Sequence, residues 1–371
     1  MRKVLKTLLV ICSLLLICEI GFLGFMMHRE KNPDTPAPGI TGPQAAVPEA
    51  TAAPETTVPE TTEAPTTVPA EPEYFTLTFT GDVTPGCMPG QFQNPKAYVG
   101  TVGDDYEFPF ANLRETFEQD DFTFINLEVV LGLNVGKQAS KTFVFSGPEE
   151  YVQIMTTSSV EAVTLANNHV EDFGTEGYEN TKRVLDENGV AYVEEDKTTI
   201  FVTESGLTIG LYADSFDFKE SDIEDNIAAL REEGAEIIVC AFHWGQEQEY
   251  KPAQNEIDWG HIAIDAGADI VAGHHPHVLQ PVEYYKNGVI FYSLGNFSFG
   301  GNANPGDTDT AILQQEVFRG PDGVMNLGEL KVIPCSITST KGQNDYQPMP
   351  LEEGSDAYNR VMEKLFGAPE A

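Results

Sequence analysis

Basic side chains are scarce in this 371-residue chain. Only 21 lysines and arginines stand against 58 aspartates and glutamates, which gives a formal net charge of −37. A field this negative repels nucleic acid and anionic lipid surfaces, so the sequence argues against both as partners. It also opposes a bare polyanionic substrate unless cations lie between the two.

Cysteine is too sparse for a disulfide framework. Two of the five cysteines, Cys12 and Cys18, lie in the N-terminal apolar segment, and Cys240 lies inside a later apolar run. Only Cys87 and Cys335 remain as a candidate pair, and the sequence leaves their pairing open.

One stretch near the N-terminus is apolar enough to consider as a membrane span. Residues 8–27 match the roughly 20 apolar residues that a helix needs to cross a bilayer. Arg2, Lys3 and Lys6 precede them, which favours a cytoplasmic N-terminus. A cleaved signal peptide is the alternative, but its apolar region usually spans only about 7–15 residues. We therefore expect residues 1–31 to be an uncleaved transmembrane anchor of a single-pass cell-membrane protein.

Lysine and arginine are missing from residues 32–73, where proline, threonine, alanine and glutamate dominate. Such a segment cannot bury enough apolar surface to offset the entropy lost on ordering, so we expect a disordered linker. The folded domain is then expected at residues 74–367. The sequence predicts that this domain is held away from the membrane on the extracytoplasmic side.

Three of the 7 histidines follow short apolar runs. Residues 237–242 and 270–272 are typical of buried parallel strands in a βαβ unit, since a helix-length segment separates them. Ligands bind beyond the carboxyl ends of such strands, where His243, His275 and His277 would converge. Imidazole is the commonest metal ligand near neutral pH, so we expect a metal or phosphate-type site. Ordinary loop histidines are the alternative.

Polar residues end other predicted strands. Asp82 follows a first strand at residues 74–80, and Asn168 and His169 follow a strand whose apolar residues end at Leu165. Glu128 follows an apolar strand, where a carboxylate is costly unless it is paired or liganded.

The order of elements indicates the fold class. Strands outnumber helices, which predicts an α/β fold of two stacked sheets with helices outside them. Residues 294–297 are expected to return to the surface near the ends of the histidine-bearing strands.

Taken together and in order, these segments resemble the CapA/PgsA family of poly-γ-glutamate capsule synthesis proteins, a branch of the metallophosphatase-like fold. The resemblance covers nearly all of residues 74–340. It is carried by Thr80-Gly81-Asp82, Asn126-Leu127-Glu128, Asn167-Asn168-His169 with Asp172, His243-Trp244-Gly245 with Glu247, His275-Pro276-His277 and Leu294-Gly295-Asn296-Phe297. It implies a four-layer α/β/β/α sandwich with these segments at the sheet edges.

The resemblance also implies a pair of divalent metal ions, with zinc, manganese and iron as candidates. Carried over by position, the ligands of one ion are Asp82, Glu128 and His277, and those of the other are Glu128, Asn168, His243 and His275. Thr84 stands where the family pattern of metallophosphoesterases has a first-strand histidine. We therefore expect weaker binding at the first position and feeble activity on simple phosphomonoesters.

Two functions follow from the resemblance. The first is a metal-dependent hydrolase or transferase that acts on a surface polymer such as poly-γ-glutamate, with His169 and Glu247 as the proton-handling residues. The second is a non-enzymatic export or scaffold component that works with other capsule synthesis subunits. Loss of function on His243→Ala would favour the enzyme.

Overall fold

The computed structural model describes residues 71–367. The expected anchor at residues 1–31 and residues 32–70 of the expected linker lie outside this range. Within residues 71–367, no helix combines the length and apolarity needed to cross a membrane.

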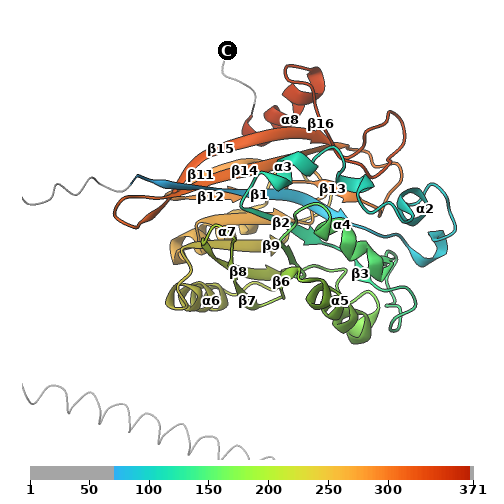
Figure 1. Ribbon diagram of the computed structural model, residues 1–371, viewed down its shortest axis with the longest axis horizontal. Helices are drawn as coiled ribbons and strands as arrows, with labels where there is room; N and C mark the ends of the chain where they lie inside the picture. The colour runs from blue at the N-terminus through green and yellow to red at the C-terminus, as the bar shows by residue number, and fades with distance from the viewer. Residues whose placement is uncertain (1–70, 368–371) are drawn as a thin grey trace, which may run out of the picture. The chain divides into compact units, whose positions relative to one another are not determined.

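Eight strands form the first sheet (Figure 1). In spatial order they are β16 (Met349–Pro350), β15 (Met325–Ser336), β14 (Asp309–Arg319), β1 (Glu73–Thr84), β2 (Phe122–Leu127), β5 (Ala162–Thr164) and β6 (Ala191–Val193), and β13 (Asn296–Phe299) pairs with β1 beside this path. β1, β2, β5 and β6 run parallel, whereas β14 and β15 form an antiparallel extension.

Six strands form the second sheet. Their spatial order is β11 (Val282–Tyr285), β12 (Gly288–Phe291), β10 (Ile270–His274), β9 (Ile237–His243), β8 (Thr208–Ser215) and β7 (Lys197–Val202). The four central strands are parallel, and the two edge strands are antiparallel to their neighbours. A separate two-residue ladder joins β3 (Val130–Leu131) to β4 (Ser146–Gly147).

The main core lies between the two sheets. Phe79 and Phe124 of the first sheet belong to one buried cluster with Val239 and Ala272 of the second. α8 (Asp356–Phe366) packs on β14 and β15 and adds to the same cluster.

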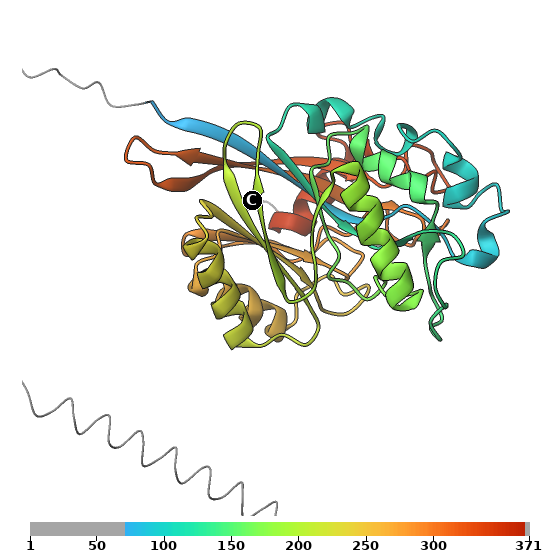
Figure 2. The same ribbon diagram turned by 60° about the horizontal axis from the view of Figure 1, so that its bottom comes forward.

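Helices cover the outer faces (Figure 1, Figure 2). The helices α2 (Tyr98–Val102), α3 (Arg114–Glu118), α4 (Val152–Thr156) and α5 (Gly174–Asn188) contribute to the cluster outside the first sheet, and α6 (Glu220–Glu232) and α7 (Gln254–Ala266) contribute to the one outside the second. The expected α/β/β/α order of layers is confirmed.

β1 and its partner β13 differ from the sequence-based expectation. β1 does not end near Thr80 but continues to Thr84, because β13 pairs with its far end and Asp82 lies opposite Asn296. Residues 294–297 lie near the ends of the histidine-bearing strands, as expected, but they do not return to the surface, and that part of the prediction is wrong. Phe297 is fully buried against the rings of Phe110 and Phe117, at centroid distances of 5.8 and 6.5 Å.

The question of a disulfide is resolved. Within residues 71–367, Cys87, Cys240 and Cys335 are all free and buried. Burial raises the pKa of the Cys87 thiol to about 11, so this cysteine behaves as a small core residue rather than a nucleophile.

The strand registers bring the carboxyl ends of both sheets to one place. His243 and His274 are Cα partners at the ends of β9 and β10. Asp82 and Asn126 are partners near the ends of β1 and β2. Side chains that are far apart in the sequence therefore meet at a common edge, as parallel strands require.

Candidate metal centre

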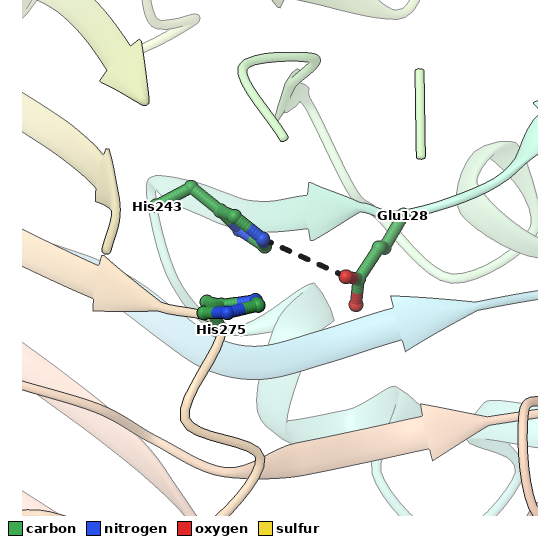
Figure 3. Close-up of side chains that lie close together, drawn as sticks. All are labelled: Glu128, His243 and His275. Carbon is green, nitrogen blue, oxygen red and sulfur yellow. Dashed lines mark ion pairs between the residues drawn. The ribbon is translucent and has the colours of Figure 1, made fainter. Parts of the chain in front are cut away.

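Glu128, His243 and His275 form one buried group (Figure 3). Their ligand atoms all lie within 4.8 Å of one another, and His243 Nε2 lies 3.7 Å from Glu128 Oε1. Asn168 Oδ1 lies 2.9 Å from the same His243 nitrogen. The four residues expected to hold one ion are thus brought together.

Asp82, Glu128 and His277 form the second group, and Glu128 is common to both. His277 Nδ1 lies 2.9 Å from Asp82 Oδ2, yet within residues 71–367 neither atom makes a well-aligned hydrogen bond. The two atoms form an ion pair when the ring is protonated, and they are placed to act as two ligands of one cation when it is not.

Glu128 provides the sharpest test of whether a cation fits. The residue is fully buried, and neither carboxylate oxygen has a hydrogen-bond partner in the described part of the chain. An unpaired buried carboxylate is costly, and bound metal removes that cost. Among residues 71–367, Nδ1 of His275 and Nδ1 of His277 lack partners as well, whereas His243 Nε2, which faces Glu128, contacts Asn168 Oδ1. This set of nitrogen and oxygen atoms suits a divalent metal.

Glu247 completes a third combination with His275 and His277, again with ligand atoms within 4.8 Å. Unlike the other residues, Glu247 is exposed and lies in the loop after β9. It was predicted to donate or accept protons. Its position beside His275 and His277 suits that role, and it also suits a ligand of a bound metal ion.

Asp82 is held by a buried relay of polar side chains. Its Oδ1 accepts hydrogen bonds from Asn126 Nδ2 at 2.8 Å and from His274 Nδ1 at 3.2 Å. Asn126 Oδ1 in turn accepts a bond from Asn167 at 3.0 Å. These donors occupy Oδ1 and leave Oδ2 free to face His277. Such supporting bonds orient a ligand and tune its affinity for metal.

His274 is a site residue that the sequence reasoning missed. It ends β10 directly before His275, and only 3% of it is exposed. The signal was available in the run His274-His275-Pro276-His277, where the first histidine lies two residues beyond the predicted strand at residues 270–272.

His169 is paired with Asp172, to which the sequence reasoning gave no role of its own. Its Nδ1 donates to Asp172 Oδ2 at 2.6 Å, which directs Nε2 toward Glu128 Oε1 at 4.0 Å. The fully buried carboxylate of Asp172 also accepts the backbone N–H of Phe145 at 2.7 Å and contacts Lys141 at 3.2 Å. The His-x-x-Asp spacing was the available signal. This pair fixes the imidazole tautomer and its orientation.

Two histidines of the centre are held neutral. Burial, together with the charge of neighbouring His275, lowers the pKa of His243 well below its usual value. Burial and the charge of His277 lower the pKa of His275 to about 4. Both rings are therefore ready to bind metal at neutral pH without losing a proton.

The other group carries protons that compete with metal. Burial would raise the pKa of Asp82, but contacts with His274 and His277 outweigh it and hold the pKa well below the usual range. Burial raises the pKa of Glu128 to about 7. Burial lowers the pKa of His277, yet the charges of Glu128 and Asp82 prevail and raise it to about 9.

The backbone at this edge is strained. His275 and His277 have φ values of 95° and 57°, a region that residues with side chains rarely adopt. Strain of this kind concentrates at functional sites. Thr84 is fully buried, and within residues 71–367 its hydroxyl has no hydrogen-bond partner.

A cleft of about 530 Å³ opens beside the centre. His169, Glu247, His277 and Asn296 line its inner end, so solvent and ligands reach the histidines from this side.

Residues 76–301 match the family described as "Bacterial capsule synthesis protein PGA_cap". The chain belongs to this family. The matched range contains every residue of the candidate metal centre, so the centre lies within the part of the chain that defines the family.

Individual relatives agree with the PGA_cap assignment. The chain is 28% identical over 330 residues to a capsule biosynthesis protein CapA of Bacillus anthracis, covering 80% of this chain and 74% of that protein. It is 29% identical over 320 residues to a PGA biosynthesis protein CapA of Bacillus subtilis, covering 79% and 78%.

Two solved structures show remote likeness to this chain. The NAD nucleotidase of Haemophilus influenzae overlaps with a TM-score of 0.40 at 12% identity, over 79% of this chain and 62% of that one. The purple acid phosphatase PPD1 of yellow lupin overlaps with a TM-score of 0.32 at 10% identity, over 70% and 53%. The layers and strand registers of this chain define its fold.

Proposed function

We propose that this chain is a divalent-metal-dependent hydrolase or transferase that acts on a surface polymer, such as poly-γ-glutamate, during capsule synthesis. The observation that carries the proposal is fully buried Glu128, whose oxygens face His243 and His277 without a hydrogen-bond partner among the described residues. A purely structural carboxylate at this depth would be paired. The printed names of the two CapA relatives support the choice of capsule polymer.

The residues assigned to metal are the two groups that share Glu128. One contains Asp82 and His277, and the other contains Asn168, His243 and His275. When bound, a pair of divalent ions lowers the pKa of a water molecule and polarises a carbonyl or phosphoryl oxygen.

His169 is the residue to which we assign proton transfer. Its Nδ1–H is fixed on Asp172, so Nε2 faces the centre and accepts or returns a proton there. Glu247 stands at the rim beside His275 and His277, where an exposed carboxylate exchanges protons with solvent.

We further propose that residues 1–31 anchor the protein in the cell membrane with its domain on the extracytoplasmic side. The basic residues Arg2, Lys3 and Lys6 before the apolar run support this orientation. Partners are then the polymer and other capsule synthesis subunits. Because the chain carries a net charge of −37, divalent cations should assist the binding of an anionic polymer.

The test compares cells that carry wild type, Asp82→Ala, His169→Ala or His277→Ala. The amount, length and attachment of surface polymer are measured, and His261→Ala serves as control because this histidine stacks on Tyr285 in the second sheet. We expect reduced or altered polymer in all three site variants and wild-type polymer in the control. If the site variants keep wild-type polymer and the purified protein turns over no substrate, the protein is a scaffold and the proposal fails.

A further inference from the structure

The cleft beside the metal centre is lined by neutral amides. Six of its side chains are asparagine or glutamine, namely Gln91, Asn94, Gln248, Asn296, Asn302 and Asn304. Amides both donate and accept hydrogen bonds. A surface built from them recognises groups that do the same.

The charges of the cleft do not suit a string of free carboxylates. Apart from histidine, its charged lining residues are Glu247 and Asp307, and neither lysine nor arginine lines it among residues 71–367. Asp307 is already engaged by Lys364 at 2.6 Å and Tyr250 at 3.0 Å. Without divalent cations, an anionic segment such as poly-γ-glutamate would thus meet acidic neighbours and no basic side chain to pair with, whereas an uncharged segment needs no cation.

Aromatic rings form the inner wall. Phe145 lies 4.5 Å from the ring of His169, and Phe299 lies 5.2 Å from the ring of His277, measured between centroids. The two phenylalanines are themselves 6.3 Å apart. Charged groups lose hydration against such a wall, so it favours an uncharged ligand.

The hydrogen bonds of the asparagines show which of their amide atoms remain for a ligand. Asn94 and Asn302 each accept a backbone N–H through Oδ1, at 3.0 and 2.8 Å, which leaves their amino groups to donate. Asn296 has the opposite arrangement. Its amino group is used on the His277 carbonyl at 3.2 Å, and its buried Oδ1 has no partner among residues 71–367.

From this lining we infer that the cleft binds an uncharged glycan segment next to the metal centre. Sugar hydroxyls donate and accept at close spacing, which matches a cluster of amides, and the apolar face of a sugar ring packs on an aromatic side chain. Phe143 lines the cleft with 55% of its surface exposed, so it is available for that contact. The inference rests on the proposed function in one respect: it takes the metal centre beside the cleft to be where the reaction occurs.

An extended peptide fits the lining less well. Most of the lining comes from turns and loops, chiefly residues 88–94 and 301–307. Peptides are commonly bound by adding a strand to a sheet edge, and turns do not supply such an edge.

The test uses the full-length protein and isothermal calorimetry in chelator, so that metal plays no part. The probes are the hexa-N-acetylated form of chitohexaose as a neutral glycan, metal-free poly-γ-glutamate oligomers, and an uncharged hexapeptide. We expect chitohexaose to bind and Phe143→Ala to weaken its affinity about two- to tenfold, since an aromatic contact contributes roughly 0.5–1.5 kcal/mol. Asn302→Asp, which removes an amino donor but keeps the Oδ1 acceptor, should weaken it as well.

Tyr284→Ala is the control, because this residue lies on β11 with 61% of its surface exposed and does not line the cleft. The inference is overturned if chitohexaose does not bind, if Phe143→Ala and Asn302→Asp leave its affinity unchanged, or if metal-free poly-γ-glutamate or the hexapeptide binds more tightly. Because metal is removed, failure of the metal proposal leaves this result unaffected, and failure of glycan binding leaves the metal proposal intact.

Discussion

At the scale of single residues, the relay around Asp82 explains how the centre is positioned. Asn126 and His274 occupy one carboxylate oxygen, and the other faces His277. His274→Leu removes one donor, so metal affinity at the Asp82 position should fall about 10–100-fold. Affinity at the position of His243 and His275 should change little. Chelator competition measures both constants.

His274→Asn is the matched control for that variant, because its amide nitrogen can replace Nδ1 as a donor to Asp82. Its affinity should lie near that of wild type. Equal affinities in His274→Leu and wild type would contradict the positioning role.

Protonation of the ligands predicts different pH responses at the two positions. The pKa of His277 is raised to about 9, so below that pH metal must displace its proton. The pKa of His275 is lowered to about 4, so no proton has to leave that ring at pH 8. Glu128, with its pKa raised to about 7, is common to both positions.

Affinity at the Asp82 position should therefore rise with pH up to about 9, whereas affinity at the other position should level off above about 7. Calorimetry at pH 8 in two buffers of different ionisation enthalpy counts the released protons. We expect close to one proton at the Asp82 position and close to none at the other. Equal release at both positions would show that the assignment of protons is wrong.

Asp172 should act through His169 rather than through metal. Asp172→Asn weakens the bond that fixes the imidazole, and loss of a comparable orienting carboxylate costs up to roughly 10⁴-fold in rate. Polymer turnover should fall by about 10²-fold or more while metal content stays at the wild-type value. A parallel loss of metal would instead assign Asp172 to folding of the site.

At the scale of elements, β1 depends on close contact with the segment before β13. A Cβ on Gly81 would lie 2.1 Å from the Gly295 carbonyl oxygen, a backbone atom that cannot move away cheaply. Gly81→Ala should therefore lower the free energy of unfolding by about 1–3 kcal/mol and displace Asp82. Thermal unfolding and metal content are the measurements.

Gly90→Ala is the control for that change, because an added Cβ there meets no heavy atom within 4 Å in the described part of the chain. Its stability should match that of wild type. If Gly81→Ala unfolds at the wild-type temperature with full metal content, the contact between β1 and Gly295 does not constrain the site.

The same elements show what the sequence could predict. Apolar runs that end in His243 and before His275 identified the strands, since hydrophobic patterning is local. The extension of β1 was not predictable, because it depends on β13, more than 200 positions away in the chain. The role of His274 was missed for the same reason, since its partner is Asp82, at a separation of 192.

Some site residues could be predicted from the sequence and others could not. Strand-end histidines were found from their spacing, and Glu128 from the cost of burying a carboxylate. The amide lining of the cleft gave no signal, because isolated asparagines and glutamines are ordinary loop residues in a sequence. Only the folded chain brings Asn94, Gln248 and Asn302 to one cleft.

At the scale of the whole molecule, the expected topology remains a prediction. Protease added to intact cells should release the folded domain by cutting within residues 32–73, because the linker expected from their proline-rich composition would be accessible. Protection in intact cells that is lost only on lysis would place the domain on the opposite side of the membrane.

The central claim is that two buried groups sharing Glu128 hold divalent metal. Metal analysis of the purified full-length chain, alone and as a His243→Ala, His275→Ala double variant, tests it most directly. We expect zinc, manganese or iron in the wild type, with the position of His243 and His275 filling first. The double variant should lose that metal but keep its fold by circular dichroism. Full metal content in a folded double variant would contradict the claim.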